Sequence, residues 1–231
     1  MKRPENSREF ADWNEEMVRR YDPDAYHTSS SLPIRMVERM RVRQVARLLA
    51  LTPEARVLEI GCGGGNVLER IGGRRFGIDL SPSMLQKAQS RLKGKAQFSR
   101  ADAMHLPFCD AAFDRVFCSE VLEHVMDPEA VVREMRRVLK PNGFAVVSVP
   151  NEDLINRVKQ VVFALPFGRR LIGGGEDGYT VADKMDDEWH LHAFSLDRLL
   201  LSAGSVFRVD RVVGVPSRLM PLRFVARFTP R

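Results

Sequence analysis

The sequence predicts an α/β fold in which a parallel sheet is covered by helices on both faces. Between residues 56 and 150, short apolar segments alternate with segments whose apolar residues recur at helical spacing. The first apolar segment runs into a glycine turn, GCGGG at 61–65, and acidic or hydroxyl residues follow the next strands. Because ligands of such sheets bind beyond the carboxyl ends of the strands, these residues are the candidate site.

The elements can be placed in order along the chain. Residues 34–51 predict an amphipathic helix that ends at Thr52-Pro53. A helix is expected to begin near Asn66, a second at Pro82 with Ser81 as its cap, and a third over 128–139, closed by a PNG turn. The predicted strands are 56–60, 75–80, 96–102, 113–119 and 143–150.

Composition sets broad limits on the kind of protein. The 231 residues are 44% hydrophobic and 29% charged, which is typical of one soluble globular domain with at most a small addition. The three cysteines form no CxxC pair, and no apolar run approaches the length of a membrane span. The start, MKRPENSREF, has no apolar core like that of a signal peptide, so we expect a cytoplasmic protein.

The glycine turn alone fits a dinucleotide, a smaller ligand or a simple tight turn. A dinucleotide fingerprint would have a third glycine where this chain has Asn66. Glu59 lies inside the first strand, and Asp79 ends the second, where an acid can accept hydrogen bonds from ribose hydroxyls. Asp102 precedes an Ala-Met pair that could flank an adenine ring. One nucleoside with a polar tail therefore fits better than two nucleosides.

Five segments resemble the successive motifs of class I S-adenosylmethionine-dependent methyltransferases, in particular the methyltransferase type 11 and ubiquinone O-methyltransferase-like group. These segments are VLEIGCGGG, GIDLSPSML, ADAMHLPF, FDRVFCSEVLEHV and RVLKPNGFAVVSVP. The resemblance is specific over 56–150 and looser elsewhere. It implies a Rossmann-like, mostly parallel sheet of seven strands, the last two at about 206–213 and 222–228, and S-adenosylmethionine as the cofactor.

Matching the motifs also implies which residues bind that cofactor. Asp79 would hold the ribose, Leu80 would border the adenine, and Asp102 with Ala103 would bind the adenine edge. Ser119 and Glu120 would lie near the sulfonium. The methionine end would be surrounded by the first strand and its turn: Glu59, Gly61, Cys62, Gly63 and Gly65.

The segment SEVLEHV offers candidate catalytic groups. If it is helical, Glu120, Glu123 and His124 share one face and could poise a base or ligate a divalent ion. The segment EWHLHAFS adds His190 and His192. This pattern is similar to the metal-binding set of plant-type small-RNA 2′-O-methyltransferases and of magnesium-dependent ubiquinone O-methyltransferases.

From this pattern we expect Glu120, His124 and His192 to be catalytic. Glu120, Glu123, His124 and His192 are the candidate ligands of Mg²⁺ or a similar ion. The alternative is local: His124 would hydrogen-bond to its neighbours, and Glu123 would be a carboxylate on a helix surface.

The acceptor is expected to bind between the additions to this core. Residues 1–52 form a helical N-terminal segment that could cover the cofactor with Trp13, Tyr21, Tyr26 and His27. Residues 53–231 form the methyltransferase domain, with an insertion at about 151–192 that could cap the acceptor site. The apolar stretch VVFALPF in this insertion could cover a greasy substrate, lie on a membrane, or simply pack on the domain.

The reading we favour is a methyltransferase (EC 2.1.1.-) that uses S-adenosylmethionine to methylate a small-molecule or lipid-like acceptor, on oxygen. A net charge of +6 and a pI near 9.5 keep two other partners open, RNA and an anionic membrane touched peripherally. RNA is the less favoured because no NPPY motif follows the fourth strand. A non-catalytic, cofactor-binding regulatory subunit is the further alternative.

Overall fold

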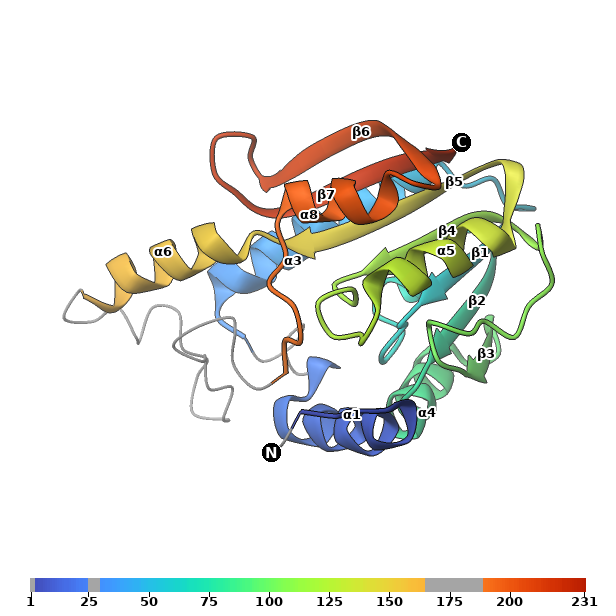
Figure 1. The fold of residues 1–231 in the computed structure, drawn as a ribbon, viewed down its shortest axis with the longest axis horizontal. Helices are drawn as coiled ribbons and strands as arrows, with labels where there is room; N and C mark the ends of the chain where they lie inside the picture. The colour runs from blue at the N-terminus through green and yellow to red at the C-terminus, as the bar shows by residue number, and fades with distance from the viewer. Residues whose placement is uncertain (1–2, 25–29, 165–188) are drawn as a thin grey trace.

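A computed structural model describes residues 3–24, 30–164 and 189–231, which build a seven-stranded sheet with helices on both of its faces (Figure 1). The strands lie in the order β3-β2-β1-β4-β5-β7-β6. All neighbours from β3 to β5 are parallel, whereas β7 runs antiparallel to β5 and β6. The strands are β1 (Arg56–Ile60), β2 (Arg74–Asp79), β3 (Ala96–Arg100), β4 (Phe113–Ser119), β5 (Leu139–Pro150), β6 (Phe207–Pro216) and β7 (Pro221–Pro230). The predicted fold class is confirmed, including the two C-terminal strands.

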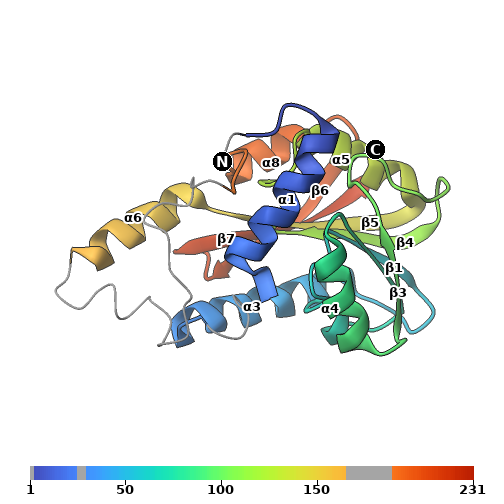
Figure 2. The same ribbon diagram turned by 90° about the horizontal axis from the view of Figure 1, so that it is seen from below.

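Helices cover the sheet in two layers (Figure 2). α5 and α8 pack on one face, and α3 and α4 pack on the other. Alternate residues of a strand serve the two cores, as Val57 and Leu58 of β1 show. The helices are α1 (Ser7–Tyr21), α3 (Leu32–Leu49), α4 (Pro82–Leu92), α5 (Pro128–Val138), α6 (Glu152–Phe163) and α8 (Leu196–Ala203). None of these helices is both long and apolar enough to cross a bilayer.

The predicted start of α4 is confirmed in detail. Ser81 Oγ accepts a hydrogen bond of 3.2 Å from the Met84 amide, and Pro82 occupies the first turn, where no intrahelical donor is lost. This cap fixes the direction in which the chain leaves β2, directly beside Asp79.

Two predictions of local structure are wrong near the first and last parallel strands. The helix expected near Asn66 is only a 3₁₀ turn, Leu68–Arg70, because Gly72 and Gly73 follow at once and β2 begins at Arg74. The expected PNG turn is instead part of β5, which is extended from Leu139 onward.

The segment SEVLEHV is a turn and not a helix. Glu120 has a φ of 56°, in the left-handed region, which interrupts any right-handed helix at its first residue. A single hydrogen bond of 2.9 Å from the His124 amide to the Val121 carbonyl closes the turn that follows. The three acidic and imidazole side chains are therefore not aligned on one helical face.

The N-terminal helix α1 lies alongside α4 (Figure 1). Its buried residues Phe10, Trp13 and Met17 pack with apolar residues that follow β2 and β4 or precede α8: Leu80, Met126, Trp189 and Leu191. Of the expected cover, Tyr26 and His27 lie outside the described residues, as does the insertion between 165 and 188.

Candidate active site

A cavity of about 480 Å³ opens at the carboxyl ends of the parallel strands. It is bordered by the glycine turn, by the loops after β2, β3 and β4, and by α1, α3 and α6. Ten of the residues expected to bind the cofactor line it: Glu59, Gly61, Cys62, Gly63, Asp79, Leu80, Asp102, Ala103, Ser119 and Glu120. The sheet thus brings together residues that are up to about 60 positions apart in the chain.

The glycine turn is held in place by β2. The Cys62 amide donates to the Ile78 carbonyl at 2.9 Å, and the Gly63 amide donates to Asp79 Oδ2 at 2.8 Å. Asp79 Oδ1 also accepts from the Ser81 amide at 2.9 Å. Two backbone donors therefore orient this carboxylate at the cavity wall, and burial raises its pKa in spite of them.

Gly61 and Gly65 are glycines for different reasons. A Cβ on Gly61 would lie 2.4 Å from Val121 Cγ2, and its φ of 67° also disfavours a side chain. Gly65 does not line the cavity; a Cβ there would lie 2.6 Å from Leu92 Cδ1 of α4. Gly65 thus allows the turn to pack closely against α4.

Glu59 and Asp102 are two acidic residues of the cavity wall that the sequence predicts to bind the cofactor. Glu59 is buried on β1, and its Oε2 has no hydrogen-bond partner among the described residues. Burial raises the pKa of Glu59 well above its ordinary value, although Arg41 opposes the shift. Asp102 Oδ1 accepts from the Met104 amide at 2.9 Å.

Glu120 belongs to a network of charges at the cavity wall. Its carboxylate lies 2.7 Å from Arg223 Nε and accepts a hydrogen bond of 2.9 Å from Ser148 Oγ. On the other side of Ser148 lies Arg41, which donates to Glu38 at 2.7 Å and hydrogen-bonds to Ser119. Four elements (α3, β4, β5 and β7) are joined in this way at the cavity wall.

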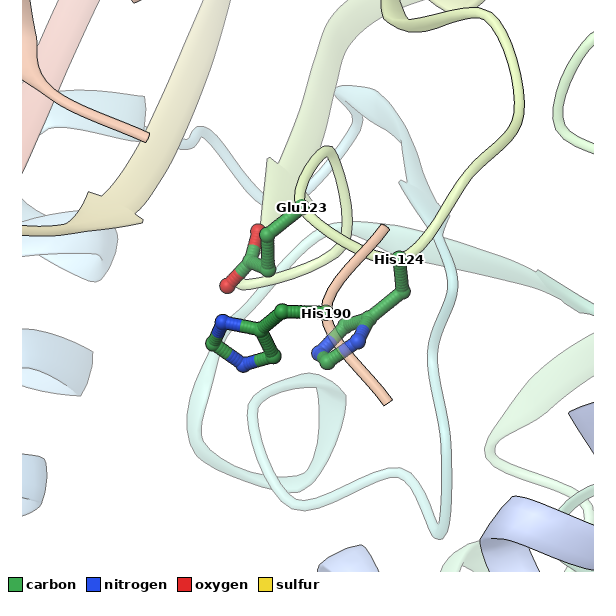
Figure 3. Close-up of side chains that lie close together, drawn as sticks. All are labelled: Glu123, His124 and His190. Atoms are coloured by element: carbon green, nitrogen blue, oxygen red, sulfur yellow. The ribbon is translucent and has the colours of Figure 1, made fainter. Parts of the chain in front are cut away.

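A second cluster, formed by Glu123, His124 and His190, lies beside this network. Each offers one ligand atom, and these atoms all lie within 4.8 Å of one another. Figure 3 shows the carboxylate and the two imidazoles turned toward one another from the turn after β4 and the segment before α8. Glu123 is buried, and its Oε2 has no hydrogen-bond partner among the described residues.

Burial disfavours the charged forms of Glu123 and His124 in this cluster. Burial raises the pKa of Glu123 well above its ordinary value, and the Glu120 charge adds to the effect. Burial, with a contribution from His190, lowers the pKa of His124 to about 3. His124 Nδ1 lies 3.3 Å from the Trp189 carbonyl oxygen, which favours a proton on Nδ1 and leaves the lone pair on Nε2.

His190, and not His192, completes the cluster. His190 Nδ1 lies 3.1 Å from Glu152 Oε1, so the carboxylate at the start of α6 orients this ring. The ring of His192 is occupied elsewhere, by the Met126 carbonyl oxygen at 3.2 Å and by Arg198 at 3.2 Å. Two positions apart in an extended strand would place both rings on one face, but the chain bends at residues 191 and 192 and the two rings reach different partners.

Sequence reasoning missed several residues of the cavity wall. For Arg41 a signal existed: it lies four residues from both Val37 and Val45, on the apolar stripe of α3. A cation on such a stripe calls for a buried partner or a ligand. Arg223 and Lys159 carry no comparable signal, because only the packing of α6 and β7 brings them here.

Comparisons with known proteins agree with this geometry. The family model described as "Methyltransferase domain" matches residues 58–147. The methyltransferase GfsG of Streptomyces halstedii is 32% identical over 155 residues, which cover 59% of this chain and 56% of that protein. A ubiquinone biosynthesis O-methyltransferase of Xanthomonas campestris pv. campestris is 38% identical over 128 residues, 52% of each chain.

The chain spans about half the length of the curated relatives that it matches. Over nearly its whole length it shares its fold with the PH0226 protein from Pyrococcus horikoshii, with a TM-score of 0.65 and 20% identity, covering 94% of this chain and 99% of that one. The matched segment contains the strands and the turn that border the cavity. Residues 58–147 of the chain match a methyltransferase domain, and the fold built around them is that of the class I S-adenosylmethionine-dependent methyltransferases.

Proposed function

We propose that this protein transfers the methyl group of S-adenosylmethionine to a hydroxyl oxygen of a small, largely apolar acceptor. The observation that carries the proposal is that one cavity holds both the expected cofactor residues and a carboxylate-imidazole cluster. When bound, the cofactor supplies an electrophilic methyl group on a sulfonium. Alignment and exclusion of water then account for much of the rate, and a base is needed only to remove the acceptor proton.

The residues of the cofactor half match the groups of the proposed ligand. Asp79, held by two backbone amides, can accept hydrogen bonds from ribose hydroxyls. Asp102 and Ala103 border the region proposed for adenine. Glu59 has an oxygen without a partner among the described residues, and a cationic amino group would favour its ionised form.

The acceptor half combines apolar walls with a proton acceptor. Ile34 and Val37 of α3 face the cavity, as do Ile155 and Val158 of α6. Glu123 and His124 reach the same space, and the raised pKa of Glu123 makes it the stronger base of the two. We therefore assign proton removal to Glu123, with the neutral His124 as a hydrogen-bonding neighbour.

The choice of oxygen as the methylated atom follows the cluster and the relatives. A carboxylate base is suited to a hydroxyl proton of an acidic phenol, whereas an amine acceptor needs no base before attack. The name of the Xanthomonas relative states O-methylation, and we extend that feature to this chain as part of the proposal. A lipid-like acceptor fits the same apolar walls.

A divalent metal is a second component that the residues could hold. Glu123, His124 and His190 offer one carboxylate oxygen and two imidazole nitrogens, and Glu152 orients His190 as outer carboxylates orient metal-bound histidines. The unpartnered Glu123 oxygen fits such a ligand role. A bound ion would supply a positive charge that lowers the pKa of an acceptor hydroxyl. Compared with the candidate ligands expected from the sequence, this set contains His190 in place of Glu120 and His192.

The experiment that tests the proposal has two stages. Calorimetry first measures S-adenosylmethionine binding, and the absence of binding below millimolar concentration would overturn the proposal. Methyl transfer from labelled cofactor is then screened over phenols, catechols, quinone precursors, sugars and RNA, with the product atom identified by mass spectrometry. Turnover on RNA alone, or cofactor binding without turnover, would favour the two alternatives.

Matched variants then test the assigned base and the metal. Glu123→Gln should lower turnover about 100-fold with cofactor binding retained, whereas Glu54→Gln, on the exposed surface, should leave it unchanged. Equilibrium dialysis against Mn²⁺ or Co²⁺ should show one ion bound, lost in Glu123→Gln and His190→Ala and kept in His192→Ala. No bound ion in the wild type would remove the metal and leave the base assignment standing.

A further inference from the structure

Other side chains of the protein occupy the space that a side chain on Gly64 would need. A Cβ on Gly64 would lie 2.5 Å from Asp24 Oδ1 and 3.0 Å from Arg91 Nη1. The φ of Gly64 is not in the left-handed region that Gly61 and Gly63 adopt, so its backbone would accept alanine without strain. What occupies the space above this glycine is an ion pair between the segment after α1 and α4.

That ion pair has the geometry of a strong contact. Arg91 Nη1 and Nη2 each donate to one oxygen of Asp24 at 2.9 Å, which makes the contact bidentate. The two side chains are only 20% and 19% exposed. Burial opposes ionisation of Asp24, yet the hydrogen bonds from Arg91 and Asn66 outweigh it and lower its pKa.

The same pair also contacts the glycine turn directly. Asn66 Nδ2 donates to Asp24 Oδ1 at 2.7 Å, and Arg91 Nη1 donates to the Gly64 carbonyl oxygen. Asp24 therefore joins three parts of the molecule: the end of the α1 segment, the glycine turn and α4. Asn66, which occupies the place of a third glycine, is used for this junction.

The α1 segment that Asp24 fastens forms one wall of the cavity. Five of its residues line the cavity: Phe10, Asn14, Val18, Tyr21 and Pro23. Pro23 immediately precedes Asp24, so a loss of the ion pair would release this wall at its point of attachment nearest the glycine turn.

We propose that Asp24 is a positioning residue for the cofactor. Its ion pair with Arg91 holds the α1 segment against the glycine turn, so cofactor binding and the seating of α1 are coupled. In this arrangement Gly64 is required to make room for the pair and not for the ligand. The inference rests on the proposed function only in using S-adenosylmethionine as the probe.

A double-variant cycle on cofactor affinity tests the inference. Asp24→Ala and Gly64→Ala should each weaken S-adenosylmethionine binding about tenfold, as expected for loss of one charge-assisted contact. The double variant should bind no more weakly than Asp24→Ala, because the 2.5 Å contact is lost with the Asp24 side chain and the Arg91 guanidinium, no longer held by Asp24, can move away from residue 64. If Gly64→Ala weakens S-adenosylmethionine binding by the same factor in the wild type and in Asp24→Ala, Gly64 makes room for the ligand and the inference is overturned.

A matched control separates this pair from an ordinary surface ion pair. Asp22 contacts Lys87 at 2.8 Å; Lys87 lies on α4, as Arg91 does, but the Asp22 and Lys87 side chains are 43% and 41% exposed. Stopped-flow measurements should show cofactor dissociation about tenfold faster in Asp24→Asn and less than about twofold faster in Asp22→Asn. Equal rates in the two variants would overturn the inference.

A measurement without ligand keeps the inference separate from the proposed function. Hydrogen exchange of the α1 amides should be faster in Asp24→Asn than in the wild type, and unchanged in Asp22→Asn. If the wild type does not bind S-adenosylmethionine, the proposed function fails while this result still stands. If α1 exchanges equally in both variants, Asp24 does not hold the segment.

Discussion

Arg223 Nε lies 2.7 Å from a carboxylate oxygen of Glu120, and this pair joins β7 to the loop after β4 at the wall of the cavity. Glu120 also accepts a hydrogen bond from Ser148 and has a φ of 56°. A residue held in the left-handed region persists only where its surroundings fix it. Here the surroundings are a cation and a hydroxyl, so Glu120 is a fixed anion of the wall and Glu123 is the freer carboxylate.

Removal of Glu120 is expected to destabilise the fold. The side chain of Arg223 is only 9% exposed, so Glu120→Ala leaves a buried cation without its shortest ion-pair contact. Breaking a buried pair in this way typically costs about 3 kcal/mol or more. Urea unfolding followed by circular dichroism measures the loss.

The control for this variant is a second arginine of β7, the strand that carries Arg223. Arg227 pairs with Asp210, and these side chains are 26% and 37% exposed. Arg227→Ala should therefore cost less than about 1 kcal/mol. If Glu120→Ala costs no more than Arg227→Ala, the network around Glu120 does not stabilise the fold.

The sequence could predict that the residues expected to bind the cofactor share one cavity, because nearly all of them lie at or just after a strand end. Asp79 and Asp102 need only the parallel order of the strands to reach the cavity that Gly63 also lines. The part of the cavity proposed for the acceptor depends on residues that return from far along the chain, such as His190 and Arg223. Nothing local distinguishes His190 from His192; the contact of one with Glu152 and of the other with Arg198 decides between them.

Glu59 is expected to lower stability as the pH rises. Burial raises the pKa of Glu59 in the folded state, so folding favours the protonated carboxyl. The fold therefore has its full stability below the ordinary pKa of 4.5 and loses this contribution as the pH rises through the folded pKa. Glu59→Gln removes this dependence. The free energy of unfolding of the variant, measured relative to that of the wild type, should be higher at pH 8 than at pH 4 by about 1 kcal/mol or more.

The same variant should bind the cofactor more weakly. If Glu59 contacts the cationic amino group of S-adenosylmethionine, an amide in its place should weaken binding about tenfold, measured by calorimetry. A variant that gains no stability at high pH would show that Glu59 is not desolvated, and unchanged affinity would place the amino group elsewhere.

His190 and His192 should differ in their effects on turnover. His190 shares the cavity with Glu123 and His124, so His190→Ala should lower the turnover number about 100-fold. His192 contacts Met126 and Arg198 outside the cavity, so His192→Ala should cost about 1 kcal/mol of stability and change turnover less than about threefold. Steady-state kinetics at saturating cofactor, with a parallel melting curve, compares the two; the reverse order would return His192 to the site.

The apolar wall formed by α6 should govern acceptor binding. Val158 is half-buried and faces the cavity, so Val158→Asp places a carboxylate where an apolar acceptor is proposed to lie. A buried charge without a partner is costly, and the KM for the acceptor should rise at least about tenfold while the affinity for S-adenosylmethionine is unchanged. Gln160→Asp adds the same carboxylate to the exposed side of this helix and should leave both constants unchanged. An unaltered KM in Val158→Asp, with the fold intact by circular dichroism, would mean that the acceptor does not use this wall and would favour a polar substrate that approaches from the side of α1.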